Sequence, residues 1–369
     1  MHRTLIAAAL MAGVATCAML TPAMAQDDLT RAQELVDTYS KPNPPWDGPT
    51  TGPAAQPDKV VVYVSTDQRN GGARGAGEGV IEAGEKIGWD VRTIDGQGTV
   101  SGRSSGLTQA IALQPDAIVL GGIDVNEQAT LIQQAADAGI KLVGWHAYST
   151  VGPHPTLPVF TNVSTDPMVV AEAAASYAIT QSDGKAGAVV FTDSVYELAV
   201  AKARKMEEVI KACSGCTVLE FVDTPLSDTS TRMPPLTTSL LQRYGADWTY
   251  SLSINDLTFD FMAPSLASAG IDGEGPPVNI SAGDGSEAAF QRIRDKQYQA
   301  ATVAEPLRLQ GWQVIDEINR ALAGEKDSGY VAPPHLFTPD NIAFDGGPNN
   351  IYDPNNDYPA IYAKIWGVN

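Results

Sequence analysis

The chain has 369 residues, of which 43% are hydrophobic and 18% are charged, a composition typical of a soluble globular protein with enough length for two domains. Acidic residues outnumber basic residues 43 to 24, which gives a formal net charge of −19. Because nucleic acids and anionic membrane surfaces attract positive charge, this balance argues against both as partners. After residue 25, no stretch approaches the roughly 20 apolar residues that a transmembrane helix needs.

The first 25 residues have the pattern of a secretory signal peptide. A short basic start at residues 1–3 precedes an apolar run over residues 4–20, and residues 23–25 have the A-x-A form of a cleavage site. We therefore expect cleavage after Ala25 and export from the cytoplasm. Cys17 leaves a lipid anchor open as an alternative, but the preceding threonine is unfavourable there, so release of the soluble protein is favoured.

Two cysteines follow the signal peptide, Cys213 and Cys216, in the sequence CSGC. In an oxidising compartment this spacing favours a local disulfide. A thioredoxin-like redox motif lies where a strand enters a helix, whereas here a predicted helix precedes the cysteines and a strand follows them. No histidine lies nearby in the sequence to complete a zinc site. We expect a structural disulfide, no metal and no cofactor, with redox or metal chemistry as less favoured alternatives.

Residues 26–58 lie between the signal peptide and the first predicted strand. We expect one short helix over residues 27–40, followed by a stretch with six prolines that leaves no room for regular structure. Two interpretations of this arm are equally supported. It is either a flexible exported segment or a segment packed over a lobe, with Trp46 as its anchor.

From residue 59 onward, short apolar runs alternate with helical patterns. The runs cover residues 60–64, 117–120, 142–145, 188–191, 248–252, 278–281 and 300–304. Continuous short runs separated by helices are typical of parallel strands that are covered on both faces and joined by βαβ crossovers. The sequence therefore predicts an α/β fold with two doubly wound parallel-sheet lobes.

The stretch over residues 141–166 joins the two halves. We expect an N-terminal lobe of residues 59–161 and 306–337, and a C-terminal lobe and tail of residues 162–305 and 338–369. Hinge crossings are expected near residues 160–163, 304–306 and 336–339. Because parallel strands in one sheet point their carboxyl ends at the same edge, the two lobes should enclose a ligand cleft.

Polar and aromatic side chains follow the predicted strands at these carboxyl ends. Carboxylates and amides bind hydroxyl groups, and aromatic faces cover the C–H side of a sugar ring. Each residue alone could equally be a turn or cap residue, but their common position favours ligand binding. The candidate ligand-binding residues are Asp67, Gln68, Arg69, Asn70, His146, Tyr148, Tyr196, Asn255, Asp284 and Glu305.

Groups suited to catalysis are scarce in this sequence. No G-x-S-x-G elbow and no H-E-x-x-H motif occurs. Asp284 and Glu305 could serve a hydrolase, but they lack a nucleophile with its base. We therefore expect no catalytic residue.

Four segments, in order, resemble one known family. The block PDAIVLGGIDVNEQATLIQQAADAGIKLVGW is similar to the second βαβ unit of ribose-binding-protein-like periplasmic binding proteins, the sugar receptors of ABC importers. WTYSLSIND resembles their strand that ends in Asn-Asp, GDGS resembles their Asp-Gly-Thr turn, and ATVAEPLRLQG resembles their last crossing. The resemblance covers residue 59 to about residue 342.

This resemblance implies ligand contacts at Asn70, Asn255, Asp284 and Glu305. His146 stands where the family has a sugar-binding Asp, and Gly72 and Ala73 stand in the first loop in place of the aromatic pair that sandwiches a pyranose. The resemblance implies a periplasmic monomer that captures a sugar or polyol between two lobes and delivers it to a membrane ABC permease. A sensory co-receptor for a chemoreceptor or kinase stays open as an alternative, and a periplasmic carbohydrate-acting enzyme is less favoured.

Overall fold

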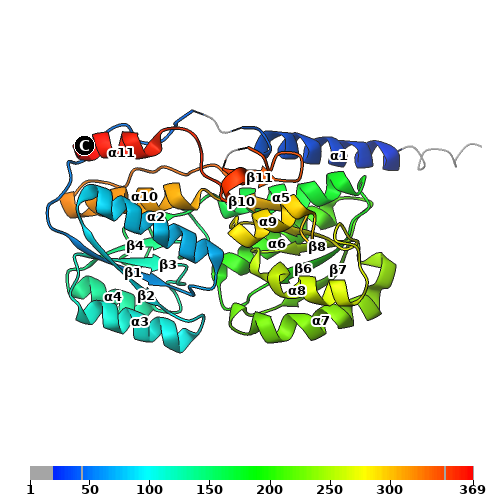
Figure 1. The fold of residues 1–369 in the computed structure, drawn as a ribbon, viewed down its shortest axis with the longest axis horizontal. Coiled ribbons are helices and arrows are strands. Elements are labelled where there is room, and N and C mark those ends of the chain that lie inside the picture. The colour runs from blue at the N-terminus through cyan, green and yellow to red at the C-terminus, as the bar shows by residue number, and fades with distance from the viewer. Residues whose placement is uncertain (1–19, 43–44, 345, 369) are drawn as a thin grey trace, which may run out of the picture.

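The structure is a computed structural model that describes residues 20–42, 45–344 and 346–368. Two α/β lobes lie next to each other, with the N-terminal helix α1 (Leu20–Tyr39) and the C-terminal helix α11 (Tyr358–Trp366) along one side (Figure 1). Most of the expected signal peptide, residues 1–19, lies outside the described residues, and its expected cleavage site falls in the first turns of α1. None of the helices in the described ranges has the length and apolar character of a membrane span.

The first lobe contains a five-stranded parallel sheet in the order β2-β1-β3-β4-β5. Its strands are β1 (Val60–Ser65), β2 (Asp90–Asp95), β3 (Ala117–Gly121), β4 (Lys141–Trp145) and β5 (Asn162–Val163). One face packs against α2 (Gly71–Ile87) and α10 (Leu307–Ala323), and the other against α3 (Val100–Ala112) and α4 (Ala129–Asp137). The runs VVVYVS and AIVLG are apolar along their length because both faces are covered.

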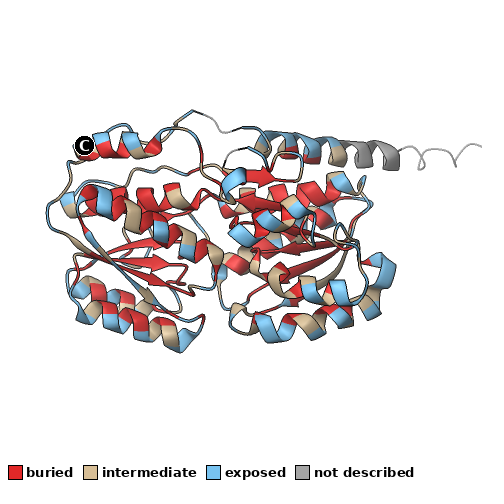
Figure 2. Cartoon of the chain, viewed as in Figure 1, coloured by how far each residue is buried: buried red, intermediate tan, exposed pale blue. Residues whose placement is uncertain are grey.

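The second lobe contains a six-stranded sheet in the order β11-β10-β9-β8-β6-β7. Its strands are β6 (Gly187–Thr192), β7 (Thr217–Asp223), β8 (Tyr250–Ser253), β9 (Val278–Ser281), β10 (Ala301–Ala304) and the antiparallel edge strand β11 (His335–Phe337). Its helices are α5 (Pro167–Gln181), α6 (Glu197–Ala212), α7 (Thr229–Tyr244), α8 (Leu257–Ser268) and α9 (Glu287–Asp295), with short 3-10 turns η1 (Leu226–Asp228), η2 (Gly245–Asp247) and η3 (Gly347–Asn349). The inner strands of both sheets are buried, whereas the edge strands β2 and β7 are mostly exposed or half-buried and the covering helices expose their outer faces (Figure 2). The predicted fold class is confirmed.

Three short segments lie in a different lobe from the one that the sequence indicated. β11 pairs with β10 in the second sheet, although residues 306–337 were expected in the first lobe. β5 pairs with β4 in the first sheet, although residue 162 was expected to begin the second lobe. α11 packs in the first lobe, although residues 338–369 were expected in the second. These strands have two or three residues, too few for a period to be recognised.

The N-terminal arm is packed and touches both lobes. α1 lies against the second lobe, where Ala32 and Val36 join the core beside α5. The chain then crosses to the first lobe, where the Trp46 ring lies 5.2 Å from the Tyr330 ring and 5.4 Å from the Tyr362 ring. Of the two interpretations of this arm, the packed segment anchored by Trp46 agrees with the structure.

Cys213 and Cys216 form a disulfide at the end of α6, as the CSGC spacing indicated. The backbone N–H of Ser214, inside this small loop, donates a hydrogen bond to Asp28 on α1. The bridge therefore shapes a loop that holds the N-terminal helix, which agrees with the structural interpretation of the two cysteines.

Candidate ligand-binding site

A pocket lies between the lobes, where the carboxyl ends of both sheets meet. Its cavity volume is about 70 Å³, and the pocket is partly open to solvent. Its lining comes from the segments after strands β1, β3, β4, β7, β8 and β9, from the first turn of α2 and from the first two turns of α6. The lining residues are Thr66, Asn70, Ala73, Gly122, Trp145, His146, Tyr196, Leu198, Ala199, Lys202, Leu226, Ile254, Asn255 and Asp284.

Ten residues were predicted to contact a ligand, and the structure gathers six of them here. The pocket lining includes Asn70, His146, Tyr196, Asn255 and Asp284. Glu305 lies directly behind His146, in hydrogen-bond contact with it. These six side chains come from both lobes and span more than 200 positions of the sequence, so their convergence follows from the sheet topology.

The other four predicted residues lie outside the pocket. Asp67 and Arg69 pair with each other, with 2.7 Å between the guanidinium and the carboxylate. The backbone N–H of Gln68 donates to Asp95, and the Tyr148 hydroxyl donates to the carbonyl of Gly152. For Asp67, Arg69 and Tyr148 the turn and loop interpretation fits the structure, because their side chains bond within their own loops. The Gln68 amide nitrogen is buried without a protein partner among the described residues and lies outside the pocket lining.

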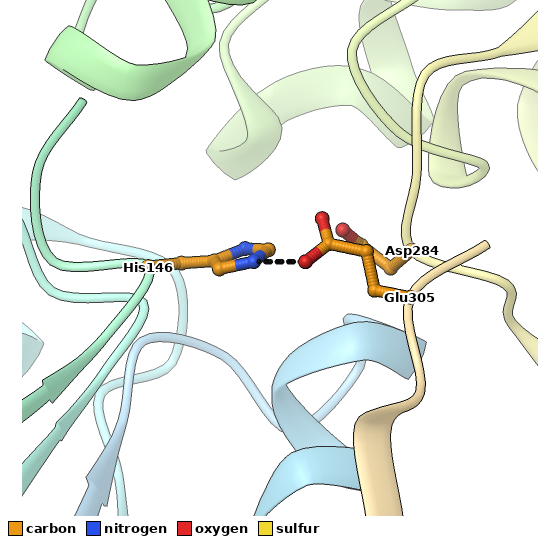
Figure 3. A group of neighbouring side chains, drawn as sticks. All are labelled: His146, Asp284 and Glu305. Atoms are coloured by element: carbon orange, nitrogen blue, oxygen red, sulfur yellow. Dashed lines mark hydrogen bonds and ion pairs between the residues drawn. The ribbon is translucent and has the colours of Figure 1, made fainter. Parts of the chain in front are cut away.

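His146 and Glu305 connect the two lobes at the inner end of the pocket. The imidazole Nε2 lies 2.8 Å from Glu305 Oε2 (Figure 3). The same oxygen accepts hydrogen bonds from the backbone N–H of Thr165 at 3.2 Å and from Gln310 Nε2 at 3.0 Å. Burial opposes the charge on Glu305, but the neighbouring His146, Lys202 and Gln310 outweigh it and lower the pKa of Glu305 to about 2. Glu305 is therefore a fixed carboxylate.

The indole ring of Trp145 packs against the imidazole of His146. The two rings are stacked, with centroids 4.0 Å apart, and Trp145 Nε1 donates to Gln310 Oε1 at 2.8 Å. Trp145 ends β4 and is 2% exposed, so its indole is chiefly core. It positions the imidazole and is not an open stacking platform.

Asp284 is the buried carboxylate that the protein leaves unpaired. It follows β9, and its side chain points toward the same space as Glu305 (Figure 3). The residue is 8% exposed, and within the described ranges no protein group donates a hydrogen bond to its carboxylate. Burial raises the pKa of Asp284 to about 6, although Lys202 and His146 act in the opposite direction.

The loop that carries Asp284 is held by its neighbours. Asp256, which follows Asn255 at the end of β8, accepts hydrogen bonds from the backbone N–H groups of Gly285 and Ser286, both at 2.9 Å. The Asp284 carboxylate also lies against the first turn of α2, where a Cβ added to Gly72 would come within 2.5 Å of it. Only glycine admits the carboxylate so close to the positive end of that helix.

Asn70 and Asn255 present their amide NH₂ groups to the pocket. Asn70 Oδ1 caps α2 by accepting from Ala73 N at 3.1 Å, and Asn255 Oδ1 accepts from Leu257 N at 3.1 Å. Because each oxygen is occupied by a backbone donor, each Nδ2 is left without an acceptor among the described protein groups. The pocket therefore holds two fixed donors.

Lys202 adds a buried ammonium that the sequence analysis did not select. The residue is 3% exposed, and its charge acts on both Asp284 and Glu305. A signal was available, because Lys202 falls in the apolar stripe of α6 beside Ala199 and Met206. A lysine at a core position of an amphipathic helix needs a partner, which is a pointer to a polar pocket.

His146, Asp284 and Glu305 offer atoms within 4.8 Å of one another, a spacing that could suit a divalent cation. The Lys202 ammonium already acts on both carboxylates, however, and Glu305 accepts three hydrogen bonds. This arrangement fits an organic ligand with hydroxyl groups better than a metal ion.

At the outer end of the pocket, paired polar groups join the lobes. Arg103 donates to the Tyr196 hydroxyl at 2.8 Å, and this hydroxyl lies 2.9 Å from Thr66 Oγ1. The next residue, Glu197 at the start of α6, accepts from Asn126 Nδ2 at 3.0 Å, and its backbone N–H donates to Asp124 at 2.9 Å. These contacts hold the first turn of α6 against the first lobe.

Solved structures of solute-binding proteins share this fold. A glucose-galactose binding protein from Geobacillus stearothermophilus is 17% identical, with 78% of this chain and 100% of that chain covered and a TM-score of 0.67. An ABC transporter solute-binding protein from Agrobacterium vitis with bound allitol is 20% identical, with 78% and 97% covered and a TM-score of 0.65. Another from the same organism, bound to α-D-tagatopyranose, is 15% identical, with 80% and 99% covered and a TM-score of 0.70.

No curated protein matches the sequence. The family model for the periplasmic binding protein domain, by contrast, matches residues 60–326, which is most of the chain and includes both sheets except β11. The two-lobe arrangement of parallel sheets is that of the ribose-binding-like, type I class. The chain therefore belongs to the periplasmic binding protein domain family.

Proposed function

We propose that this protein captures one small polyhydroxylated solute, a sugar or a polyol, between its lobes in the periplasm and delivers it unchanged to an ABC permease. The observation that carries the proposal is the set of buried, unpaired groups in the pocket. Asp284 supplies an acceptor, while Lys202 and the amides of Asn70 and Asn255 supply donors. A hydroxyl both donates and accepts, so a polyol satisfies both kinds of group at once.

The neighbouring structures support the same ligand class. Those described above are named as binding glucose and galactose, or are bound to allitol or tagatopyranose. Their ligands differ in ring form and stereochemistry, so they support a class of ligand and leave its identity to experiment. Membership of the family supports a periplasmic location and an ABC transporter as the partner.

A carbohydrate-acting enzyme is supported less well. Such an enzyme needs two free carboxylates, one on each side of the scissile bond. Glu305, the second carboxylate at this site, lies behind His146 and is held by three hydrogen bonds. A sensory co-receptor would use the same pocket and would differ only in the membrane partner that its closed form contacts.

A thermal-shift screen of the mature protein over sugars, polyols and small acids tests the proposal. A ligand that binds only the folded state raises the melting temperature by mass action. We expect at least one sugar or polyol to do so, to bind with 1:1 stoichiometry in calorimetry and to be recovered chemically intact. A screen in which only small acids bind, or recovery of an altered ligand, would overturn the proposed function.

A further inference from the structure

The inner end of the pocket, at His146 and Glu305, is its polar end, and the outer end, at Tyr196, is its apolar end. The order of strands in the second sheet separates the two. Along the carboxyl edge, Glu305 follows β10, Asp284 follows β9 and Asn255 follows β8. The next two strands, β6 and β7, are followed by the lining residues Leu198 and Leu226. The lining therefore changes from carboxylate and amide to leucine along one sheet edge, while Lys202, one turn after Leu198 on α6, acts on the carboxylates of the polar end.

Contacts between the lobes confirm which ends face each other. At the polar end, His146 after β4 meets Glu305, with 2.8 Å between the ring nitrogen and the carboxylate. At the apolar end, Thr66 after β1 meets Tyr196, with 2.9 Å between the hydroxyls. Because β4 and β1 lie on opposite sides of β3 in the first sheet, the two contacts mark the two ends of the pocket.

The hydroxyl and guanidinium groups that join the lobes at the apolar end are already occupied. Among the described residues, unpartnered hydroxyls lie nearby at Ser65 and Thr192, but both are buried and neither residue lines the pocket. The Tyr196 hydroxyl accepts from Arg103 and pairs with Thr66, and Arg103 also donates to Glu127 at 2.9 Å. Asp193, at the end of β6, accepts from the backbone N–H groups of Val195 and Leu226. A ligand hydroxyl placed beside Leu198 and Leu226 would therefore find no free partner among these groups.

From this polarity we propose that the ligand is amphipathic, with its hydroxyl groups at one end and a methyl or short alkyl group at the other. A 6-deoxyhexose or a deoxypolyol has this form, whereas a hexose that is hydroxylated at every carbon does not. This inference rests on the proposed function and deepens it. A buried hydroxyl without a partner costs about ten-fold or more in affinity, while a methyl group there gains from contact with leucine.

Calorimetry on matched sugar pairs tests the inference. The pairs are L-fucose with L-galactose and L-rhamnose with L-mannose, and the reduced forms fucitol with galactitol, which differ only in the hydroxyl at one terminal carbon. We expect a deoxy member to bind about ten-fold tighter than its partner. Equal or tighter binding of the fully hydroxylated members would overturn the amphipathic ligand but keep the proposed function. Binding of no sugar or polyol, in the pairs or in the wider screen, would overturn both.

A variant pair gives a second readout that does not depend on absolute affinity. Leu226 lines the pocket and is half-buried, so Leu226→Asn should fold and place an amide at the apolar end. We expect the preference for the deoxy sugar to fall at least three-fold in this variant. Leu241, also half-buried in the second lobe but outside this pocket, supplies the control Leu241→Asn. An unchanged preference in Leu226→Asn, with the melting temperature retained, would contradict the inference.

Discussion

The two ends of the interlobe pocket differ in whether their polar side chains have hydrogen-bond partners in the protein. At the inner end, Asp284 and Lys202 are buried without a hydrogen-bond partner in the described chain. At the outer end, Tyr196 and Glu197 are paired across the lobes with first-lobe side chains. Unpaired polar groups in a largely buried pocket destabilise a protein by themselves, and a ligand that pairs with them would offset that cost. The comparison indicates that the inner end binds the polar groups of the ligand and that the paired side chains of the outer end hold the lobes together.

The largest effect is expected from removal of the unpaired carboxylate. Hydrogen bonds to a charged group contribute about 1.5–3 kcal/mol, so Asp284→Ala should weaken ligand binding by roughly one to two decades. Asp67→Ala is the control, because Asp67 is an equally buried carboxylate at a strand end that lies outside the pocket. Calorimetry should show near wild-type affinity for Asp67→Ala. Equal losses of affinity in the two variants would show that Asp284 contributes no more to ligand binding than Asp67 does.

The buried charge of Asp284 should also lower the free energy of unfolding of the ligand-free protein, by an amount that depends on pH. Burial raises the pKa of Asp284 to about 6, above its ordinary value of 3.8, so the folded protein without ligand binds this proton more tightly than the unfolded chain does. The cost of the charge is fully present above pH 6 and declines as the pH falls from 6 toward 4. Asp284→Asn should therefore be more stable than wild type at pH 7.5, by on the order of 2 kcal/mol, and should lose this advantage near pH 4.

Urea unfolding of the protein without ligand at both pH values measures this difference. Glu305 behaves oppositely, since a pKa of about 2 gives stability above its ordinary value of 4.5 that is lost as the pH falls toward 2. Comparison of Asp284→Asn with wild type measures the Asp284 titration together with its repulsion by Glu305. A variant that is less stable than wild type at pH 7.5 would show that Asp284 is well paired in the folded state.

Gly72 tests how closely the lobes must approach at the inner end. An added Cβ would lie 2.5 Å from the Asp284 carboxylate, in the other lobe. Overpacking of this kind typically costs 1–3 kcal/mol, so Gly72→Ala should weaken ligand binding about ten-fold and enlarge the radius of gyration of the complex. Gly75→Ala in the same helix is the control, because its Cβ would meet only the flexible side chain of Leu307. Small-angle scattering that shows no difference between the two variants would contradict this contact.

The smallest effect is expected at the outer end. Tyr196→Phe removes the hydroxyl that accepts from Arg103 and pairs with Thr66. Because the Arg103 guanidinium keeps its ion pair with Glu127, we expect a loss of only about 1 kcal/mol. Because the contacts of the Tyr196 hydroxyl form between the lobes, we expect a three- to ten-fold faster ligand dissociation with little change in association. Tyr244→Phe is the control, since the Tyr244 hydroxyl bonds within the second lobe. Stopped-flow kinetics measure the ligand dissociation rate of both variants. An unchanged rate in Tyr196→Phe would show that the outer contacts do not hold the lobes closed around the ligand.

Site residues that directly follow strands could be predicted from the sequence, whereas the site residue on the inward face of a helix was missed. Asn255 and Asp284 were found because they directly follow apolar runs, and parallel strands bring such positions together. Lys202 was missed because it lies in the second turn of α6, where only the packing of that helix turns its ammonium toward Asp284. The segment Asp67–Gln68–Arg69 was selected by the same strand-end rule, but local pairing turns the Asp67 and Arg69 side chains away from the pocket.

The most direct test of ligand capture between the lobes is a crystal structure of the mature protein with its tightest-binding sugar or polyol. We expect an intact ligand in the pocket, with one hydroxyl within hydrogen-bond distance of the Asp284 carboxylate and another within reach of Asn255 Nδ2 or the Lys202 ammonium. A ligand bound elsewhere on the protein, or bound between the lobes with no contact to Asp284, would contradict the account.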